Sequence, residues 1–294
     1  MYEKVESCPV CNSRSFQNYI ICQDASVSNE SFALTKCAEC GFIATNPRPN
    51  ENEISKYYES EDYISHSDKG NNLTNVLYKL VRKFTLRQKL RLLNFFKTEK
   101  QLLDYGCGTG DFIAHCANNG WSVTGIEPNP QAREIAEKKV GKSVFNKLKK
   151  LDADQTFDII TLWHVLEHVH DINKLLKKLK ALLSKKGFLI IALPNCDSWD
   201  QKHYKEHWAA YDVPRHLHHF NPLTFKTLAK NHQLKLTRVL PMKFDAFYVS
   251  LLSEKYKNGK QNFLQSFING WKSNNWAKQN NNNYSSVIYI LKKK

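Results

Sequence analysis

Three glycines at alternate positions, in the run Asp104-Tyr-Gly-Cys-Gly-Thr-Gly110, follow a short apolar stretch and precede a helical pattern. Gly106, Gly108 and Gly110 allow the backbone to turn sharply and to approach a ligand that any Cβ would repel. Asp104 adds a carboxylate at the end of the preceding strand. Because the spacing differs from the common G-x-G-x-x-G fingerprint, the turn alone predicts only a nucleotide-like ligand.

The next predicted strand, residues 121–126, ends in Glu127, seventeen residues after Gly110. An acidic side chain at this point can accept the hydrogens of both hydroxyls of a ribose. The glycine turn and the acidic strand end are far more specific together than either is alone.

Two C-x-x-C pairs lie near the N-terminus and provide Cys8, Cys11, Cys37 and Cys40. Four thiolates at this spacing predict one tetrahedral, structural zinc ion. A disulfide or a redox C-x-x-C fits a cytosolic chain less well. The zinc would hold together a small ribbon, residues 1–45, that is too short for an ordinary core.

Eight of the eleven histidines lie between residues 164 and 219. The string His164-Val-Leu-Glu-His168 matches the H-x-x-E-H motif of one zinc-peptidase class, but it directly follows an apolar strand, so His164 is expected in a loop rather than on a metal-binding helix. We therefore disfavour a peptidase. Each histidine of the string has two competing interpretations, a role in proton transfer or simple capping and packing.

A second polar group follows the fifth predicted strand, on the side of a parallel sheet where ligands bind. Its members, which can grip an anionic or hydroxylated acceptor and take its proton, are Tyr211, Arg215, His216, His218 and His219. Strand-like alternation predicts that His216 and His218 share one face. A metal site built from the three histidines lacks a suitably spaced carboxylate and is disfavoured.

The elements that position these residues alternate between helix and strand. Continuous apolar strands with amphipathic helices between them predict an α/β fold with a parallel sheet covered on both faces. The first predicted strand ends at Leu103. The others span residues 121–126, 143–145, 157–162, 187–193, 234–240 and 286–291. The predicted domain organisation is a zinc ribbon at 1–45, a linker and helical segment at 46–98, and the α/β domain at 99–294. An insertion at about 241–285 is a candidate lid or homodimer surface.

The chain has 294 residues and a formal net charge of +15. Because the lysines are spread along the sequence, a solvated basic surface is favoured over a nucleic-acid or membrane footprint. No signal peptide and no apolar run near eighteen residues is present, which predicts a soluble, cytoplasmic protein without a membrane span.

Residues 104–110, followed by Gly125-Ile-Glu-Pro-Asn129, resemble motif I and the acidic second-strand end of class I S-adenosylmethionine-dependent methyltransferases. The resemblance covers residues 99–294 and implies a seven-stranded Rossmann-like sheet whose last strand is antiparallel. It also implies that the methyl donor lies across the carboxyl ends of the first strands. The implied donor-binding residues are Asp104, Gly106, Gly108, Gly110, Glu127, Pro128, Asn146, Trp163 and His164.

Residues 157–169 closely resemble the ubiquinone-biosynthesis and sugar C-methyltransferase branch of that family. This resemblance implies histidine-assisted O- or C-methylation of a small metabolite or sugar-nucleotide. The candidate catalytic residues are His164, His168, His216, His218 and Tyr211. One alternative is an RNA methyltransferase that uses the zinc ribbon and the basic surface, and another is a non-catalytic donor-binding or assembly protein.

Overall fold

The computed structural model describes residues 1–58, 73–152 and 154–294, and the side chains of residues 73–80 are also outside the description. Its main sheet has six strands in the order β11-β12-β9-β8-β6-β7. Only β12 runs antiparallel to its neighbours β9 and β11. The bounds are β6 (Gln101–Tyr105), β7 (Ser122–Ile126), β8 (Phe157–Trp163), β9 (Leu183–Pro194), β11 (Leu234–Pro241) and β12 (Ser286–Lys293).

The predicted α/β fold and its antiparallel last strand are confirmed, but the predicted count of seven strands is wrong for the described chain. The segment expected as the third strand pairs with β7 at a single bridge, between Phe145 and Ile126. This segment lies at the outer edge of the sheet, where only one neighbour is available to extend a ladder. The single bridge still places the exposed Asn146 next to the end of β7.

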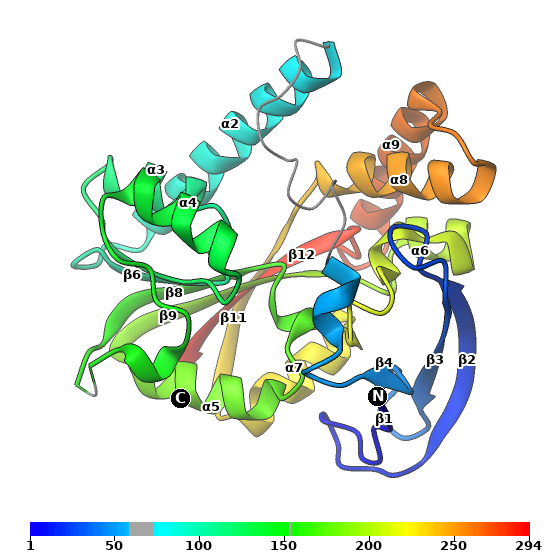
Figure 1. Cartoon of the computed structure of the whole chain (residues 1–294), viewed down its shortest axis with the longest axis horizontal. Coiled ribbons are helices and arrows are strands. Elements are labelled where there is room, and N and C mark those ends of the chain that lie inside the picture. Colours follow the sequence, from blue (N-terminus) through cyan, green and yellow to red (C-terminus); the bar gives the residue numbers. More distant parts are fainter. Residues whose placement is uncertain (59–72, 153) are drawn as a thin grey trace.

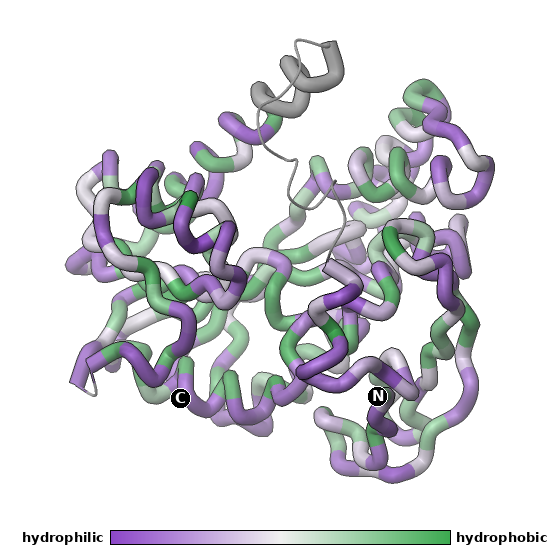
Figure 2. Tube along the Cα trace, viewed as in Figure 1, coloured by the Kyte–Doolittle hydropathy of each residue, from purple (hydrophilic) through white to green (hydrophobic). Residues whose placement is uncertain are grey.

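Helices cover both faces of this sheet (Figure 1). On one face lie α2 (Leu73–Phe95), α3 (Asp111–Ala117) and α4 (Pro130–Val140), and on the other lie α5 (Ile172–Leu182) and α7 (Pro222–Asn231). The apolar stretches of the central strands stand out in Figure 2. In β8 the residues from Ile159 to Leu162 are all buried, as expected for a strand that is covered on both faces.

The N-terminal segment forms a second, antiparallel sheet in the order β10-β4-β3-β2. Three of its strands belong to the N-terminal segment, namely β2 (Phe16–Gln23), β3 (Ser31–Cys37) and β4 (Ile43–Thr45). The edge strand β10 (His218–His219) comes from the α/β domain. Cys8 and Phe42 also belong to the same buried cluster as Phe220 and the main-sheet residue Leu193. The ribbon is therefore joined to the domain by both a strand and a shared core.

The insertion before the last strand folds into two helices, α8 (Asp245–Asn258) and α9 (Phe263–Gln279), which lie beside α6 (Trp199–Tyr204). They project beyond the sheet, across the molecule from α3 and α4 (Figure 1). The short remaining elements are β1 (Tyr2–Glu3), β5 (Arg48–Pro49), and the 3-10 turns η1 (Ile54–Tyr58), η2 (Leu148–Lys150), η3 (Leu166–His168), η4 (Lys205–His207) and η5 (Ala209–Tyr211).

No helix in the described part of the chain is long and apolar enough to cross a membrane.

Candidate active site

The glycine turn between β6 and α3 has the predicted backbone. Gly106, Gly108 and Gly110 all have positive φ angles, of 76°, 55° and 79°. A Cβ on Gly110 would lie 2.8 Å from the Cα of Ala136, so this glycine allows α3 and α4 to pack closely. A Cβ on Gly108 would meet nothing within 4 Å. Gly108 therefore faces open space into which a ligand can settle against bare backbone.

Glu127 follows directly after β7, and its side chain contacts the backbone of the glycine turn. Its carboxylate accepts hydrogen bonds from the backbone N–H groups of Gly108 (2.8 Å) and Asn129 (2.9 Å). Burial raises the pKa of Glu127, while these N–H groups and Arg133 oppose the shift. Each carboxylate oxygen has two lone pairs, so each can accept a further hydrogen from a ribose hydroxyl. Pro128 follows Glu127 in the chain, and the Glu127 N–H donates to the carbonyl of Phe145 (2.8 Å), the residue before the exposed Asn146.

Asp104 is buried and accepts a hydrogen bond of 2.6 Å from Thr161 Oγ1 of the neighbouring strand β8. Burial raises the pKa of Asp104 to about 7, against the opposing effects of Thr161 and of Lys89. Lys89 comes from α2, and its Nζ lies 4.2 Å from the centre of the Trp163 ring. The sequence did not reveal Lys89, because a lysine on an amphipathic helix normally lies on its solvated face.

His164 lies directly after β8, in a backbone conformation with φ of 57° that is uncommon for a residue with a Cβ. Its Nε2 is 3.1 Å from Asp245 Oδ2 and its Nδ1 is 3.4 Å from Glu167 Oε1. Burial alone would lower the pKa of His164, but the two carboxylates outweigh it and raise the pKa to about 9. The imidazole is thus held between two acids at the strand end.

Asp245 is the second residue that the sequence did not reveal. It begins α8, inside the insertion, and an acidic residue in the first turn of a helix is ordinary. Its position relative to His164 depends on how the insertion folds back over the sheet, for which no local signal exists.

Glu167 and His168 lie between β8 and the next long helix. They lie on the separate 3-10 turn η3, and α5 begins only at Ile172, capped by the Asp171 side chain. In this turn the Glu167 carboxylate is buried, and neither of its oxygens has a hydrogen-bond partner with good geometry among the described residues. The contact with His164, together with nearby histidines, outweighs burial and lowers the pKa of Glu167.

His168 and His216 come together beside Glu167, with ring centres 4.6 Å apart. The Nδ1–H of His216 donates to the carbonyl of Ala210 (2.9 Å), and that of His168 to the carbonyl of Arg215 (3.0 Å). One ligand atom from each of Glu167, His168 and His216 lies within 4.8 Å of the other two, which is also a spacing that suits a cation.

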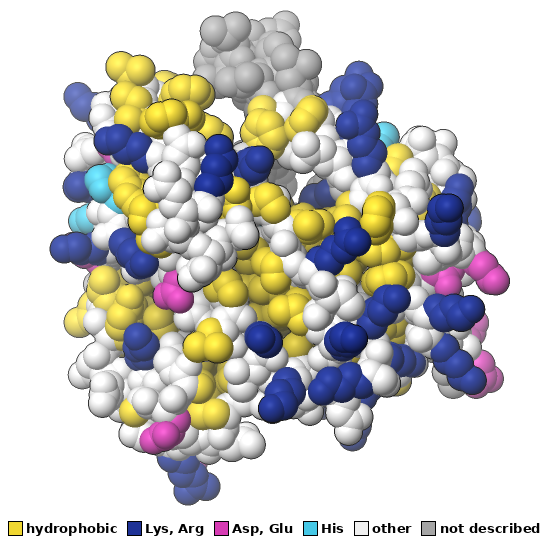
Figure 3. Space-filling view, turned by 180° about the vertical axis from the view of Figure 1, so that it is seen from behind, with side chains coloured by type: hydrophobic (Ala, Val, Ile, Leu, Met, Phe, Trp, Pro, Cys, Tyr) yellow, Lys and Arg dark blue, Asp and Glu magenta, His cyan; other side chains and the backbone are white. Residues whose placement is uncertain are grey.

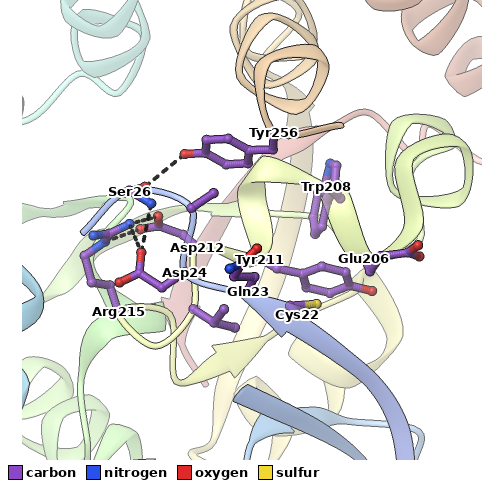
Figure 4. Close-up of a pocket in the computed structure, with 12 residues that line it drawn as sticks. Cys22, Gln23, Asp24, Ser26, Glu206, Trp208, Tyr211, Asp212, Arg215 and Tyr256 are labelled. Atoms are coloured by element: carbon purple, nitrogen blue, oxygen red, sulfur yellow. Dashed lines mark hydrogen bonds and ion pairs between the residues drawn. The ribbon is translucent and has the colours of Figure 1, made fainter. Parts of the chain in front are cut away.

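Tyr211 and Arg215 do not present free polar groups to an acceptor. Arg215 forms an ion pair with Asp212 and donates to the backbone carbonyl of Tyr57 (2.9 Å), and Asp24 of the ribbon lies 3.8 Å away. Figure 4 shows the two aspartates around the guanidinium, in a pocket that Tyr256 also lines. The buried Tyr211 hydroxyl accepts a hydrogen bond from Gln201 (2.8 Å). Arg215 thus reaches Asp24 of the ribbon, and Tyr211 packs in the buried cluster that contains Cys22 and Phe32 of the ribbon, so both residues join the ribbon to the domain.

His218 and His219 are buried in the same junction. His218 lies next to Phe42 and Phe220, and its Nε2–H donates to the Val169 carbonyl (2.9 Å). Burial lowers the pKa of His218 to about 3. His219 contacts Thr45 of β4 (3.1 Å). The structure brings His164, His168 and His216 close to Glu167, but it places His218 in the strand that completes the ribbon sheet, which corrects its expected position over the cleft.

The four N-terminal cysteines converge as predicted. Cys8 Sγ is 3.5 Å from Cys40 Sγ, and Cys11 Sγ is 3.5 Å from Cys37 Sγ. All four sulfur atoms lie within 4.8 Å of one another, and all four residues are free thiols. Tetrahedral zinc with bonds of about 2.3 Å requires sulfur separations of roughly 3.8 Å, so the group fits this ion.

A family model described as "Methyltransferase domain" matches residues 79–239, which is more than half of the 294-residue chain. The mitochondrial ubiquinone biosynthesis O-methyltransferase of Schizosaccharomyces pombe is 26% identical over 54% of this chain and 62% of that protein. The ubiquinone biosynthesis O-methyltransferase of Pelagibacter ubique is 29% identical over 50% of this chain and 65% of that protein. The match therefore spans less than two thirds of the length of each relative.

Among solved structures, magnesium protoporphyrin IX methyltransferase from Synechocystis PCC 6803, with bound SAH, is similar with a TM-score of 0.55. The two chains are 12% identical, and the match covers 83% of this chain and all of that one. This likeness supports the fold alone. The glycine turn, the carboxylate after β7 and the family match together establish that the chain belongs to the class I S-adenosylmethionine-dependent methyltransferases.

Proposed function

We propose that this protein transfers a methyl group from S-adenosylmethionine to an oxygen or carbon atom of a small-molecule acceptor, with His164 as the general base. The observation that carries the proposal is the position of His164, at the end of the strand next to the glycine turn and between two carboxylates. The ubiquinone biosynthesis O-methyltransferases to which the chain is similar support a small hydroxylated acceptor.

The donor site is supported by the open space above Gly108 and by the spare lone pairs of Glu127. Glu127 binds the ribose hydroxyls, Gly106 and Gly110 shape the turn, and Asn146 lies where the adenine is bound. Lys89 supplies a positive charge for the donor's carboxylate. When bound, the donor supplies an electrophilic methyl group, so the protein has only to align the acceptor and remove its proton.

The two carboxylates around His164 have different parts in this mechanism. Glu167 is 1% exposed and faces Nδ1, so it holds the ring in one orientation, as the acid of a catalytic triad does. Asp245 is more exposed and faces Nε2. An acceptor hydroxyl replaces Asp245 at Nε2 of His164 and passes its proton to this nitrogen. Only the neutral imidazole can take this proton, and its fraction grows as the pH approaches the raised pKa of His164.

We also propose that Cys8, Cys11, Cys37 and Cys40 bind one structural zinc ion, supported by the sulfur geometry. The free thiols accord with a reducing compartment such as the cytoplasm.

Incubation of the protein with methyl-labelled donor and a cell extract tests the proposed acceptor class. We expect label in the small-molecule fraction, and we expect this label to fall to background in Glu127→Ala and to drop strongly in His164→Ala. Label that accumulates in RNA instead would overturn the small-molecule proposal in favour of the RNA methyltransferase interpretation. Donor binding without transfer to any fraction would favour a non-catalytic donor-binding protein.

A further inference from the structure

Helix α9 has its polar and apolar faces reversed relative to an ordinary surface helix. Its buried residues are small or polar, namely Ser266, Asn269, Gly270, Ser273, Asn274 and Ala277. Of its large apolar residues, Ile268 and Trp276 are half-buried, and four are exposed: Phe263 by 56%, Leu264 by 72%, Phe267 by 61% and Trp271 by 58%. Three of these follow one another at intervals of four residues and so form one stripe along the helix. We call these four residues the apolar stripe.

The orientation of α9 is fixed by specific bonds on its buried face. Asn269 Nδ2 donates to the Tyr204 hydroxyl (2.8 Å), and Ser273 Oγ donates to the buried carboxylate of Asp200 (2.8 Å). Gly270 packs so closely on α8 that a Cβ there would lie 2.6 Å from the Phe247 ring. The helix cannot rotate to bury its apolar stripe without losing these contacts. The exposure of the stripe is thus built into the fold.

The surroundings of the stripe are strongly basic. From Lys255 to the C-terminus the sequence contains eight lysines and no aspartate or glutamate. The lysines nearest the stripe in sequence are exposed, with Lys255, Lys257 and Lys260 at the end of α8 and Lys272 on α9 itself. Figure 3 shows hydrophobic side chains gathered near the upper edge of the molecule, with lysine and arginine side chains beside them.

We propose that the α8–α9 pair docks the protein on an anionic lipid surface, with the apolar stripe inserted at the headgroup level. Exposed aromatic and leucine side chains beside lysines are the composition of helices that lie in a membrane interface. The pair also projects from the body of the protein, so it can reach a flat surface (Figure 1). This inference is independent of the acceptor proposed above.

Two other occupants fit the face less well. In a symmetric dimer the same patch meets itself, and the lysines of one copy would face those of the other. Single-stranded RNA would use stacking on aromatic rings. The most exposed member of the stripe is Leu264, which has no ring on which a base can stack.

Sedimentation of the full-length protein with vesicles tests the proposal. We expect co-sedimentation with vesicles of phosphatidylglycerol and phosphatidylcholine in equal parts, and little with phosphatidylcholine alone. Leu264→Ser together with Trp271→Ser should weaken binding by roughly tenfold or more, because both side chains leave the apolar phase. The matched control is Leu223→Ser on α7, which removes a leucine of similar exposure, 68%, and should leave binding unchanged.

The charge requirement has its own matched pair of variants. Replacing Lys255, Lys257 and Lys260 by glutamate should abolish binding at physiological salt. The same replacement of the exposed Lys174, Lys177 and Lys178 on α5 should reduce it far less. Donor affinity, measured by calorimetry, should stay the same in every variant, which shows that the fold is intact.

Equal binding to both kinds of vesicle, or binding that the Leu264→Ser/Trp271→Ser variant retains, would overturn the proposal. A concentration-dependent dimer that this variant abolishes would assign the face to a second copy of the chain. Salt-dependent RNA binding that it abolishes, without vesicle binding, would assign the face to nucleic acid.

Discussion

The proposed donor side and acceptor side of the site are built in different ways. The donor side consists of the glycine turn and Glu127, which lie within 24 residues of sequence and are joined by a direct hydrogen bond. The acceptor side is assembled from the end of β8, the start of α8 and the loop that carries His216, with the ribbon packed behind that loop. A local motif can thus specify the donor side, whereas the acceptor side depends on how distant segments meet.

The largest expected effect is a loss of donor affinity caused by changes on the donor side alone. Glu127→Ala removes the carboxylate proposed to accept from the ribose hydroxyls, and Gly108→Val fills the open space above the turn. Each should lower donor affinity by roughly 100-fold or more, because hydrogen bonds to a charged group are lost or sterically blocked. Isothermal calorimetry with S-adenosylmethionine measures the effect.

Gly141→Val is the matched control for Gly108→Val. Gly141 also has a positive φ angle, 68°, and open space around it, but it caps the far end of α4. Donor affinity should be almost unchanged in this variant. Unaltered affinity in both Glu127→Ala and Gly108→Val would contradict the donor site.

The next largest effect is expected when the zinc site is removed, and it should damage the acceptor side more than the donor side. We expect one zinc ion per chain by elemental analysis, and its loss in Cys8→Ser. Because β10 and Phe220 connect the ribbon to the histidine loop, turnover should then fall far more than donor affinity does. Cys22→Ala, which changes another buried cysteine of the ribbon, should keep the zinc.

The metal count also tests the group of Glu167, His168 and His216. A second equivalent of metal that persists in Cys8→Ser and disappears in His216→Ala would place a cation there. A chain that purifies without zinc and keeps full activity would contradict the structural zinc site.

A third effect concerns the chemistry itself. His164→Ala should lower the turnover rate by roughly 100-fold or more, the usual contribution of a general base, and leave donor affinity intact. His207→Ala, which removes an exposed histidine, serves as the control. Full turnover in His164→Ala would remove this residue from the mechanism.

The smallest effect is a change in pH dependence. A pKa of about 9 leaves His164 mostly protonated at neutral pH, so turnover should rise as the pH approaches 9. Asp245→Asn removes a carboxylate that raises this pKa, so the rising limb should move to lower pH. Turnover on the plateau should fall by up to about tenfold, because an imidazole of lower pKa is a weaker general base. A limb that stays in place would show that Asp245 does not act on His164, and Asp152→Asn is the exposed control.

The periodicity of the apolar residues predicted much of the fold. Apolar strands alternating with amphipathic helices predicted the parallel sheet, and the ends of β7 and β8 lie within one residue of the predictions. The errors have physical causes. The edge segment near Phe145 has only one neighbouring strand, and α9 was not recognised because its apolar residues point to solvent.

The residues of the candidate site also differ in whether the sequence could predict them. Gly108 and Glu127 were predictable because their roles follow from residue type and spacing within one turn. Lys89 and Asp245 were not, because a lysine on a surface helix and an aspartate at a helix start are ordinary features. His218 was expected near the ligand because it follows β9. Instead it pairs with β4, and this pairing places it in the junction between the ribbon and the α/β domain.

By itself the sequence determined the class of the protein, its glycine turn and the two cysteine pairs that converge in the structure, because each is set by residues a few positions apart. Only the tertiary structure decided which of the clustered histidines lies between two carboxylates and which ones are packed against the ribbon. It also decided that the stripe on α9 remains exposed. These properties depend on contacts between segments far apart in the chain, and residue spacing does not encode them.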